Sequence, residues 1–233
     1  MKNKMKIFTV SLGCDKNLVD TEKMLGYLQE NQYELTDTES KADVIIVNTC
    51  AFIRDAKEES IQTILDLSDY KTNGNCKALL VTGCLGQRYA KDILEELPEV
   101  DGILGTNDYS HLTQAIENAL NHEKPVFTTG INESHPQLDA RVISAPGHSA
   151  YLKIAEGCDK HCTYCIIPSM RGTYRSFPIE TLIREAQKLI SNGVKELILV
   201  AQETTLYGTD LYGKKQISVL LDQLNQLEGL EWI

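Results

Sequence analysis

Residues 151–165 read Tyr151-Leu-Lys-Ile-Ala-Glu-Gly-Cys158-Asp-Lys-His-Cys162-Thr-Tyr-Cys165, a short apolar strand followed by a loop that carries three cysteines. The spacing Cys-x-x-x-Cys-x-x-Cys can hold an iron–sulfur cluster at three corners, which leaves the fourth iron open. Structural metal sites usually close their shell with four ligands. No cysteine follows Cys165. The spacing therefore predicts a cluster at Cys158, Cys162 and Cys165 that binds a further ligand.

S-adenosylmethionine is the natural candidate for that further ligand. Its amino and carboxylate groups can chelate the open iron, and one electron from the cluster can then break a carbon–sulfur bond to give an adenosyl radical. The rival interpretation is a zinc ion with His161 or a distant residue as its fourth ligand, although this spacing differs from the paired Cys-x-x-Cys of zinc knuckles.

The region that surrounds this loop has the alternating pattern of a barrel. Apolar periodicity predicts strands at 151–155 and 197–201, helices at 178–191 and 217–227, and the start of a third strand at 231–233. Two such units cannot close a barrel, which needs roughly 200 residues or more. We therefore expect residues 150–233 to be the first part of a partial TIM barrel, and the chain to be a fragment of a longer protein.

A separate α/β domain is predicted before the barrel. Its expected strands and helices alternate along the chain: strands at 6–10, 44–47, 78–81 and 102–104, and helices at 16–30, 52–70, 89–97 and 110–121. Apolar strands that alternate with helices indicate a parallel sheet covered on both faces. We take 1–122 as this N-terminal domain. The stretch 123–149 holds three prolines and little helical period, which is typical of a linker.

Three cysteines of the N-terminal domain each follow a predicted strand: Cys14, Cys50 and Cys84. The carboxyl ends of parallel strands share one edge of a sheet, where ligands bind. Any one of these cysteines alone would more often be a core residue, but the recurrence at three strand ends favours a second three-cornered cluster site. Gly13 and Gly83 precede two of them and would let the backbone approach an inorganic group.

Composition indicates a cytoplasmic protein. Seven cysteines in 233 residues with 42% hydrophobic content are too few for a disulfide scaffold, so reduced thiols are expected. The apolar run near the N-terminus is too short for an export signal, and no stretch approaches the length of a membrane span. The formal net charge of −10 argues against a nucleic-acid-binding surface and suits a basic protein partner.

Four ordered motifs resemble the methylthiotransferases of the radical S-adenosylmethionine superfamily, over nearly the whole chain. They are Ser11-Leu-Gly-Cys14-Asp-Lys-Asn17, Asn48-Thr-Cys50-Ala-Phe52, Thr82-Gly-Cys84-Leu-Gly-Gln-Arg88, and Glu156-Gly-Cys158 through Pro168-Ser-Met-Arg-Gly172. The resemblance implies an enzyme with one [4Fe-4S] cluster on each cysteine triad and S-adenosylmethionine as cosubstrate. Tyr164 sits where the superfamily contacts adenine, and no catalytic residue beyond the cluster ligands is implied.

Within this family the chain is most similar to the branch that modifies an aspartate of ribosomal protein uS12. The features that resemble this branch are Gly13-Cys14-Asp-Lys-Asn17, Ile167-Pro168-Ser-Met-Arg-Gly172 and Ala201-Gln-Glu-Thr-Thr-Leu-Tyr-Gly208. Glu203 departs from the aspartate expected there but preserves the charge. The resemblance implies radical transfer of a methylthio group to the β-carbon of the aspartate, with an electron donor of the flavodoxin or ferredoxin type.

Two other functions remain open at this point. A tRNA adenosine methylthiotransferase would share every metal ligand and differ only in its substrate. A non-catalytic iron–sulfur protein for electron transfer or sensing would not need an open iron, and it would therefore fail to cleave S-adenosylmethionine.

Overall fold

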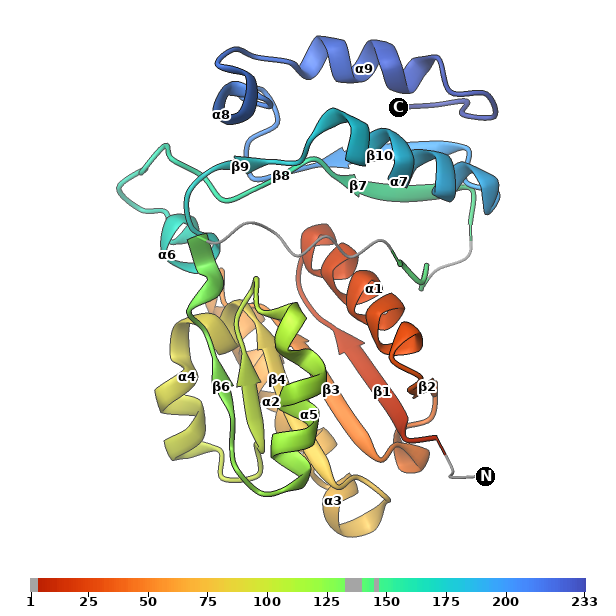
Figure 1. Cartoon of the computed structure of the whole chain (residues 1–233). Coiled ribbons are helices and arrows are strands. Elements are labelled where there is room, and N and C mark those ends of the chain that lie inside the picture. Colours follow the sequence, from red (N-terminus) through yellow and green to blue (C-terminus); the bar gives the residue numbers. More distant parts are fainter. Residues whose placement is uncertain (1–3, 133–139, 145–146) are drawn as a thin grey trace. The chain divides into compact units, whose positions relative to one another are not determined.

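The computed structural model describes residues 4–132, 140–144 and 147–233, and the chain divides into two compact units, Met1–Val142 and Ile143–Ile233 (Figure 1). Both units are built from strands and helices, and the strands pair in parallel except for one short antiparallel pair in the second unit, which confirms the predicted α/β class. Along the described residues, no helix is both long enough and apolar enough to cross a membrane.

The first unit contains a six-stranded sheet in the order β2-β1-β3-β4-β5-β6, and every neighbouring pair is parallel. The strands are β1 (Lys6–Ser11), β2 (Glu34–Leu35), β3 (Val44–Thr49), β4 (Ala78–Gly83), β5 (Gly102–Leu104) and β6 (Val126–Phe127). The central strands β3 and β4 are buried along their whole length, because helices cover both faces of the sheet.

The helices of this unit are α1 (Asp15–Glu30), α2 (Arg54–Ser68), α3 (Tyr70–Asn73), α4 (Cys84–Glu96) and α5 (Leu112–Leu120), with short 3-10 turns at Glu39–Lys41, Tyr109–His111 and Gly130–Asn132. Helices α1 and α5 cover one face of the sheet (Figure 1), where Met24, Leu28 and Ile116 pack against Ile46 and Leu80. Helices α2 and α4 pack against β3 and β4.

Two predictions for this unit need correction in detail. Helix α4 begins at Cys84 instead of near residue 89. The non-helical backbone of Tyr89 (φ −123°, ψ 28°) divides α4 into two segments, and the prediction covered only the second. Strand β6 lies inside the stretch 123–149 that was predicted as a linker, and it pairs Ile103 with Val126 and Leu104 with Phe127. Pro136 and Pro146, which supported the linker, lie outside the described residues.

The second unit begins with β7 (Ser149–Lys153), β8 (Ala155–Glu156), α6 (Ile167–Arg171) and β9 (Arg175–Ser176), and continues with α7 (Ile179–Ser191), β10 (Glu196–Val200), α8 (Thr209–Tyr212) and α9 (Ile217–Asn225). Strands β7 and β10 are parallel neighbours, with Leu152 opposite Leu199. Trp232 forms a parallel bridge to Glu196 beside β10, at the position predicted for a third strand.

The predicted strand 151–155 is divided in the structure. Strand β7 ends at Lys153, and β8 then pairs with β9 in the antiparallel direction, with Ala155 opposite Ser176 and Glu156 opposite Arg175. The cysteine loop therefore follows β8, past the carboxyl end of β7. The apolar face of α7 closes the core over β7 with Leu182, Ala186 and Leu189.

Candidate cluster-binding sites

The structure places Cys14, Cys50 and Cys84 at one edge of the six-stranded sheet. Cys14 caps the start of α1 after β1, Cys50 follows β3, and Cys84 is the first residue of α4 after β4. In the sheet, β1, β3 and β4 are adjacent. The chain continues from β1 to β2 on one side and from β3 to β4 on the other, so the direction of strand addition switches between β1 and β3. Such a switch point is where ligands bind in open α/β sheets. The helix starts at Cys14 and Cys84 also favour negative charge at this edge.

Glycines draw the three cysteine loops together. Gly13 has φ 88°, and a Cβ added to it would lie 2.5 Å from Cβ and 2.9 Å from Sγ of Cys50. Gly83 has φ 87°, and a Cβ there would collide with Asn48 Oδ1 and lie 2.5 Å from the Thr49 carbonyl oxygen. The sequence predicts that Gly13 and Gly83 let the backbone approach an inorganic group. In the structure these glycines make room for Cys50 and Asn48.

Two buried asparagines join the loops by hydrogen bonds. The Asn17 side chain donates to the carbonyl oxygens of Leu12 at 2.9 Å and Thr49 at 3.0 Å. The Asn48 side chain donates to the Asn17 carbonyl oxygen and to Thr21 Oγ1, both at 2.9 Å. Because these bonds cross from α1 to the end of β3, they fix the Cys14 loop relative to the Cys50 loop.

Ser60 of α2 fixes the backbone of Cys50. The Cys50 N–H donates to Ser60 Oγ at 3.0 Å. The Ser60 hydroxyl is in turn within donor distance of two carbonyl oxygens, that of Cys50 at 3.0 Å and that of Ala56 at 2.8 Å. Ser60 is fully buried. These hydrogen bonds hold the backbone of Cys50. Its thiol is not part of a disulfide and is available as a ligand.

Cys76 lies away from this edge, in the turn before β4. It is buried, and its thiol donates to the Ala78 carbonyl oxygen at 3.3 Å. Burial raises the pKa of Cys76 to about 11. Metal ligation needs the thiolate form, so the environment of Cys76 opposes a role as ligand.

In the second unit, Cys158, Cys162 and Cys165 lie in the loop between β8 and α6. Cys158 and Cys165 are partly exposed and Cys162 is exposed. The Cys158 N–H donates to the Gly172 carbonyl oxygen at 3.1 Å, which ties the start of the loop to the end of α6. Gly157 (φ 76°) permits this closure, because a Cβ there would collide with the Thr173 carbonyl oxygen.

A buried charged network lies at the base of this loop, centred on Glu156. Glu156 Oε2 accepts hydrogen bonds from Lys153 Nζ at 2.9 Å and Arg171 Nη1 at 3.0 Å, and Oε1 accepts one from Gln202 Nε2 at 2.6 Å. Lys153, Glu156 and Arg171 are each at most 3% exposed. A carboxylate buried with two cations and an amide is well compensated, and it joins β7, β8, α6 and the segment after β10.

Glu203 ties the segment after β10 to the cysteine loop. Its carboxylate pairs with Lys160 and accepts a hydrogen bond from the Thr205 N–H at 2.9 Å. The hydrogen bond from Lys160, with those from Thr205, lowers the pKa of Glu203 to about 2. Tyr174 donates to the Glu203 carbonyl oxygen at 2.9 Å, and burial raises the pKa of Tyr174 to about 12. The carboxylate is therefore charged and the phenol neutral at physiological pH.

Tyr164, the residue predicted to contact adenine, has a side chain that is 90% exposed within its own unit. His161, the alternative zinc ligand, has a left-handed backbone (φ 47°) in the same loop. Within the described ranges, no group of three or more His, Cys, Asp or Glu residues converges closely enough to hold a single metal ion.

A four-iron cluster and a single metal ion need different arrangements of thiolates. A cluster takes each thiolate on a different iron atom, so its ligands surround a volume and need not converge on one point. Each unit carries one of the two predicted triads, and the cysteines of both triads are free. The triads are predictions from the sequence, which did not identify the residues that form hydrogen bonds around them. The available signals were a polar Asn48 at the end of an apolar strand and a Glu156 inside another.

Comparisons with known families agree with this division of the chain. Residues 6–105 match the uncharacterized protein family UPF0004, and residues 152–229 match the radical SAM superfamily. Among solved structures, the cobalamin-dependent S-adenosylmethionine radical enzyme OxsB is similar over 99% of this chain and 38% of its own, with a TM-score of 0.61 and 12% identity. The radical S-adenosylmethionine methyltransferase TsrM, with cobalamin and a [4Fe-4S] cluster bound, gives a TM-score of 0.57 at 10% identity, over 96% of this chain and 51% of its own.

Curated relatives are far more similar in sequence. The ribosomal protein uS12 methylthiotransferase RimO of Lachnoclostridium phytofermentans is 56% identical over 98% of this chain and 52% of its own length. The protein of that name from Clostridium perfringens strain SM101 is 53% identical over 99% of this chain and 52% of its own length. The chain thus spans about half the length of these relatives. Together the two matched segments and these relatives confirm the resemblance, and the chain belongs to the radical S-adenosylmethionine methylthiotransferase family.

Proposed function

We propose that this chain is the cluster-binding part of an enzyme that transfers a methylthio group to the β-carbon of an aspartate in ribosomal protein uS12. The observation that carries the proposal is the pair of free cysteine triads, one at the switch point of a parallel sheet and one in the loop after β8. The relatives that match nearly the whole chain are named for the same activity, and a tRNA substrate or a non-catalytic role has no comparable support.

We assign Cys14, Cys50 and Cys84 to one [4Fe-4S] cluster, and Cys158, Cys162 and Cys165 to the other. When bound, the second cluster would supply the electron that cleaves S-adenosylmethionine. Radical chemistry suits this substrate, because the C–H bond at the aspartate β-carbon is not acidic enough for a side-chain base. The exposed ring of Tyr164 is free to stack on the adenine of that cosubstrate.

The protein residues around each triad position the ligands. Asn17, Asn48 and Ser60 fix the backbone at the first site through buried hydrogen bonds. At the second site, Glu156 anchors the start of the loop from beneath. Ligands held on rigid supports in this way keep the geometry that a reactive site needs.

The physiological setting follows from the same chemistry. Reduced thiols and a ribosomal substrate support a cytoplasmic setting, and we propose a flavodoxin or ferredoxin type protein as the electron donor. The net charge of −10 suits a basic ribosomal protein and opposes a polyanionic tRNA.

Two measurements test the proposal. The aspartate-containing peptide of uS12 should carry a methylthio group in cells with the full-length protein and lack it in cells without. A methylthio group missing from tRNA adenosine instead would transfer the assignment to the tRNA branch.

The ligand assignment is tested on the full-length protein reconstituted without oxygen. Replacing Cys158, Cys162 and Cys165 by Ala should remove about half of the iron and all adenosyl cleavage. Replacing Cys14, Cys50 and Cys84 by Ala should also remove about half of the iron, but keep cleavage and abolish methylthio transfer. Full iron content in either triple variant would refute the assignment.

A further inference from the structure

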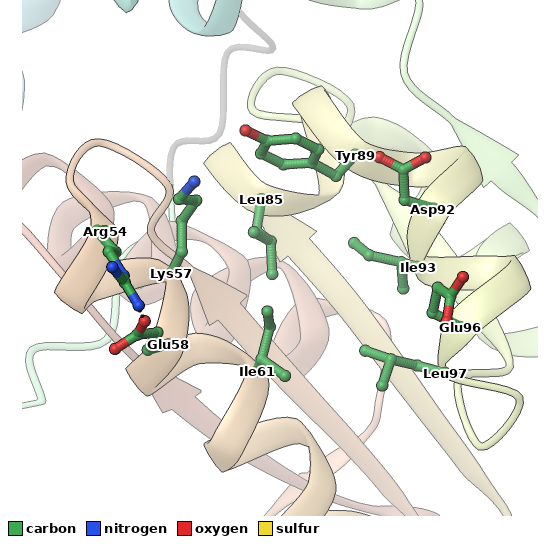
Figure 2. Close-up of a pocket in the computed structure, with 10 residues that line it drawn as sticks. All are labelled: Arg54, Lys57, Glu58, Ile61, Leu85, Tyr89, Asp92, Ile93, Glu96 and Leu97. Atoms are coloured by element: carbon green, nitrogen blue, oxygen red, sulfur yellow. Dashed lines mark hydrogen bonds and ion pairs between the residues drawn. The ribbon is translucent and has the colours of Figure 1, made fainter.

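A groove of about 460 Å³ lies between α2 and α4 in the first unit (Figure 2). Its apolar floor consists of Ile61 from α2 and Leu85, Ile93 and Leu97 from the α4 side. Leu85 directly follows the cluster ligand Cys84, so the groove starts at the edge of the sheet that carries the first triad. This volume is in the range of sites that accept a specific ligand or an anchoring group.

The kink in α4 shapes this groove. The non-helical backbone of Tyr89 separates the segment that begins at Cys84 from the segment with Asp92 and Glu96. The Tyr89 ring lies over the groove (Figure 2), and Lys57 of α2 reaches it with Nζ 5.6 Å from the ring centroid. This cation–π contact spans the groove, and Arg88 Cζ lies 4.8 Å from the centroid of the same ring, so positive charge gathers around Tyr89.

On the α4 side of the groove, the charged residues of the lining are both acidic, Asp92 and Glu96. Arg54 is paired with Glu58 at 2.7 Å, so these two charges offset each other. Asp92 and Glu96 lie one turn apart on α4, and both are exposed. Throughout the described part of the chain, neither carboxylate takes part in an ion pair or a hydrogen bond. The groove therefore combines an apolar floor with two unpaired carboxylates on one side.

The beginning of α2 adds exposed apolar side chains. Ile61, which lines the groove, is 39% exposed, whereas Leu65, one turn further along, is 38% exposed and lies outside the lining. Phe52 and Ile53, just before α2, are more than half exposed. Large apolar side chains that gather on one exposed surface mark an interaction site more often than single ones do.

We propose that the groove between α2 and α4 docks a basic segment of the protein substrate, with an apolar side chain of that segment on the floor and a lysine or arginine against Asp92 and Glu96. The proposal rests on the proposed function, which supplies a basic protein as substrate, and adds the surface that recognises it. A buried apolar anchor flanked by complementary charge is the usual composition of a binding hot spot. Because Leu85 lines one end of the groove, a segment docked there would reach toward the sheet edge that carries the first triad.

The test uses full-length enzyme with both clusters reconstituted, and measures the Kd for purified uS12 by fluorescence anisotropy. Two adjacent residues of α4 give a matched pair: Glu96→Lys changes one of the two acidic residues on the α4 side of the groove, whereas Glu95→Lys makes the same change outside the lining. Ile61→Gln and Leu65→Gln form a second pair, because the two residues have nearly equal exposure on one helix.

We expect Glu96→Lys and Ile61→Gln each to weaken uS12 binding about tenfold, which corresponds to about 1.4 kcal/mol. The two controls should stay within about twofold of the parent. Raising the salt concentration should weaken binding of the parent more than binding of Glu96→Lys, since the variant lacks one charge contact. Adenosyl cleavage without uS12 should be the same in all five proteins, which shows that they are folded and loaded.

Each remaining outcome counts against the proposal. Parent enzyme that does not bind uS12 would refute the substrate assignment and the groove proposal with it. Parent that binds, with groove variants that bind equally well, would refute the groove alone. Groove variants that change the sedimentation coefficient but not the uS12 affinity would show that a second copy of the chain occupies the groove.

Discussion

Gly13 packs directly against Cys50, so closely that a Cβ on Gly13 would lie 2.5 Å from the Cys50 Cβ. This contact brings the residue before Cys14 against the cysteine that follows β3, so two cysteines 36 positions apart in the sequence lie at one edge of the sheet. The backbone of Gly13 is left-handed (φ 88°), which adds a second reason why only glycine fits.

We therefore expect Gly13→Ala to lose the first cluster. The added methyl must displace Cys50, and the left-handed backbone costs about 1–2 kcal/mol for a residue with a Cβ. In reconstituted full-length protein the iron content should fall by about half while adenosyl cleavage persists. Gly193→Ala is the control, since it is equally left-handed (φ 98°) but has no atom within 4 Å of its Cβ position. Normal iron content in Gly13→Ala would contradict the close approach.

The Glu156 network should be essential for the second unit. Glu156→Gln leaves Lys153 and Arg171 buried without their carboxylate, and such a loss lowers the free energy of unfolding by about 3–5 kcal/mol. The variant should also lose the cluster signal of the Cys158 loop in electron paramagnetic resonance after reduction. Glu228→Gln removes an exposed carboxylate and should change neither quantity. Stability and signal equal to the parent would show that Glu156 does not anchor the loop.

Cys76 should be the least reactive cysteine of the described part. With its pKa raised to about 11 by burial, only about one thiol in a thousand is ionised at pH 8. Iodoacetamide at pH 8, followed by peptide mass mapping of cluster-free reduced protein, should label the exposed Cys14 and Cys162 and leave Cys76 unmodified. Labelling of Cys76 should rise with pH toward 11. Rapid modification at pH 8 would mean that the thiol is accessible and ionised.

The first unit should require residues beyond the predicted boundary at 122. Strand β6 extends the sheet, and Arg141 pairs with Glu22 at 2.6 Å where both side chains are at most 7% exposed. A fragment 1–142 should therefore unfold at a higher urea concentration than a fragment 1–122. In the longer fragment, Arg141→Ala removes the cation from this buried pair and should lower the free energy of unfolding by about 3 kcal/mol. Equal midpoints for all three proteins would place the boundary at 122, as the composition alone indicated.

The sequence by itself determined the local features of this protein. Continuous apolar runs and period-3.6 patterns depend only on neighbours along the chain. They locate β3, β4 and α7 and place Cys14, Cys50 and Cys84 after strands. The spacing of Cys158, Cys162 and Cys165 is likewise local, and it indicated a cluster with an open iron before any fold was known.

The tertiary structure decided everything that depends on pairing between distant segments. Strand order puts β1 beside β3, which brings Gly13 to Cys50, and no local pattern encodes that order. Strands of two residues such as β6 are too short for a period and exist only because β5 offers its edge. The start of α4 at Cys84, the partners of Glu156 and the groove between α2 and α4 arise in the same way, since burial and charge compensation are properties of packed neighbours.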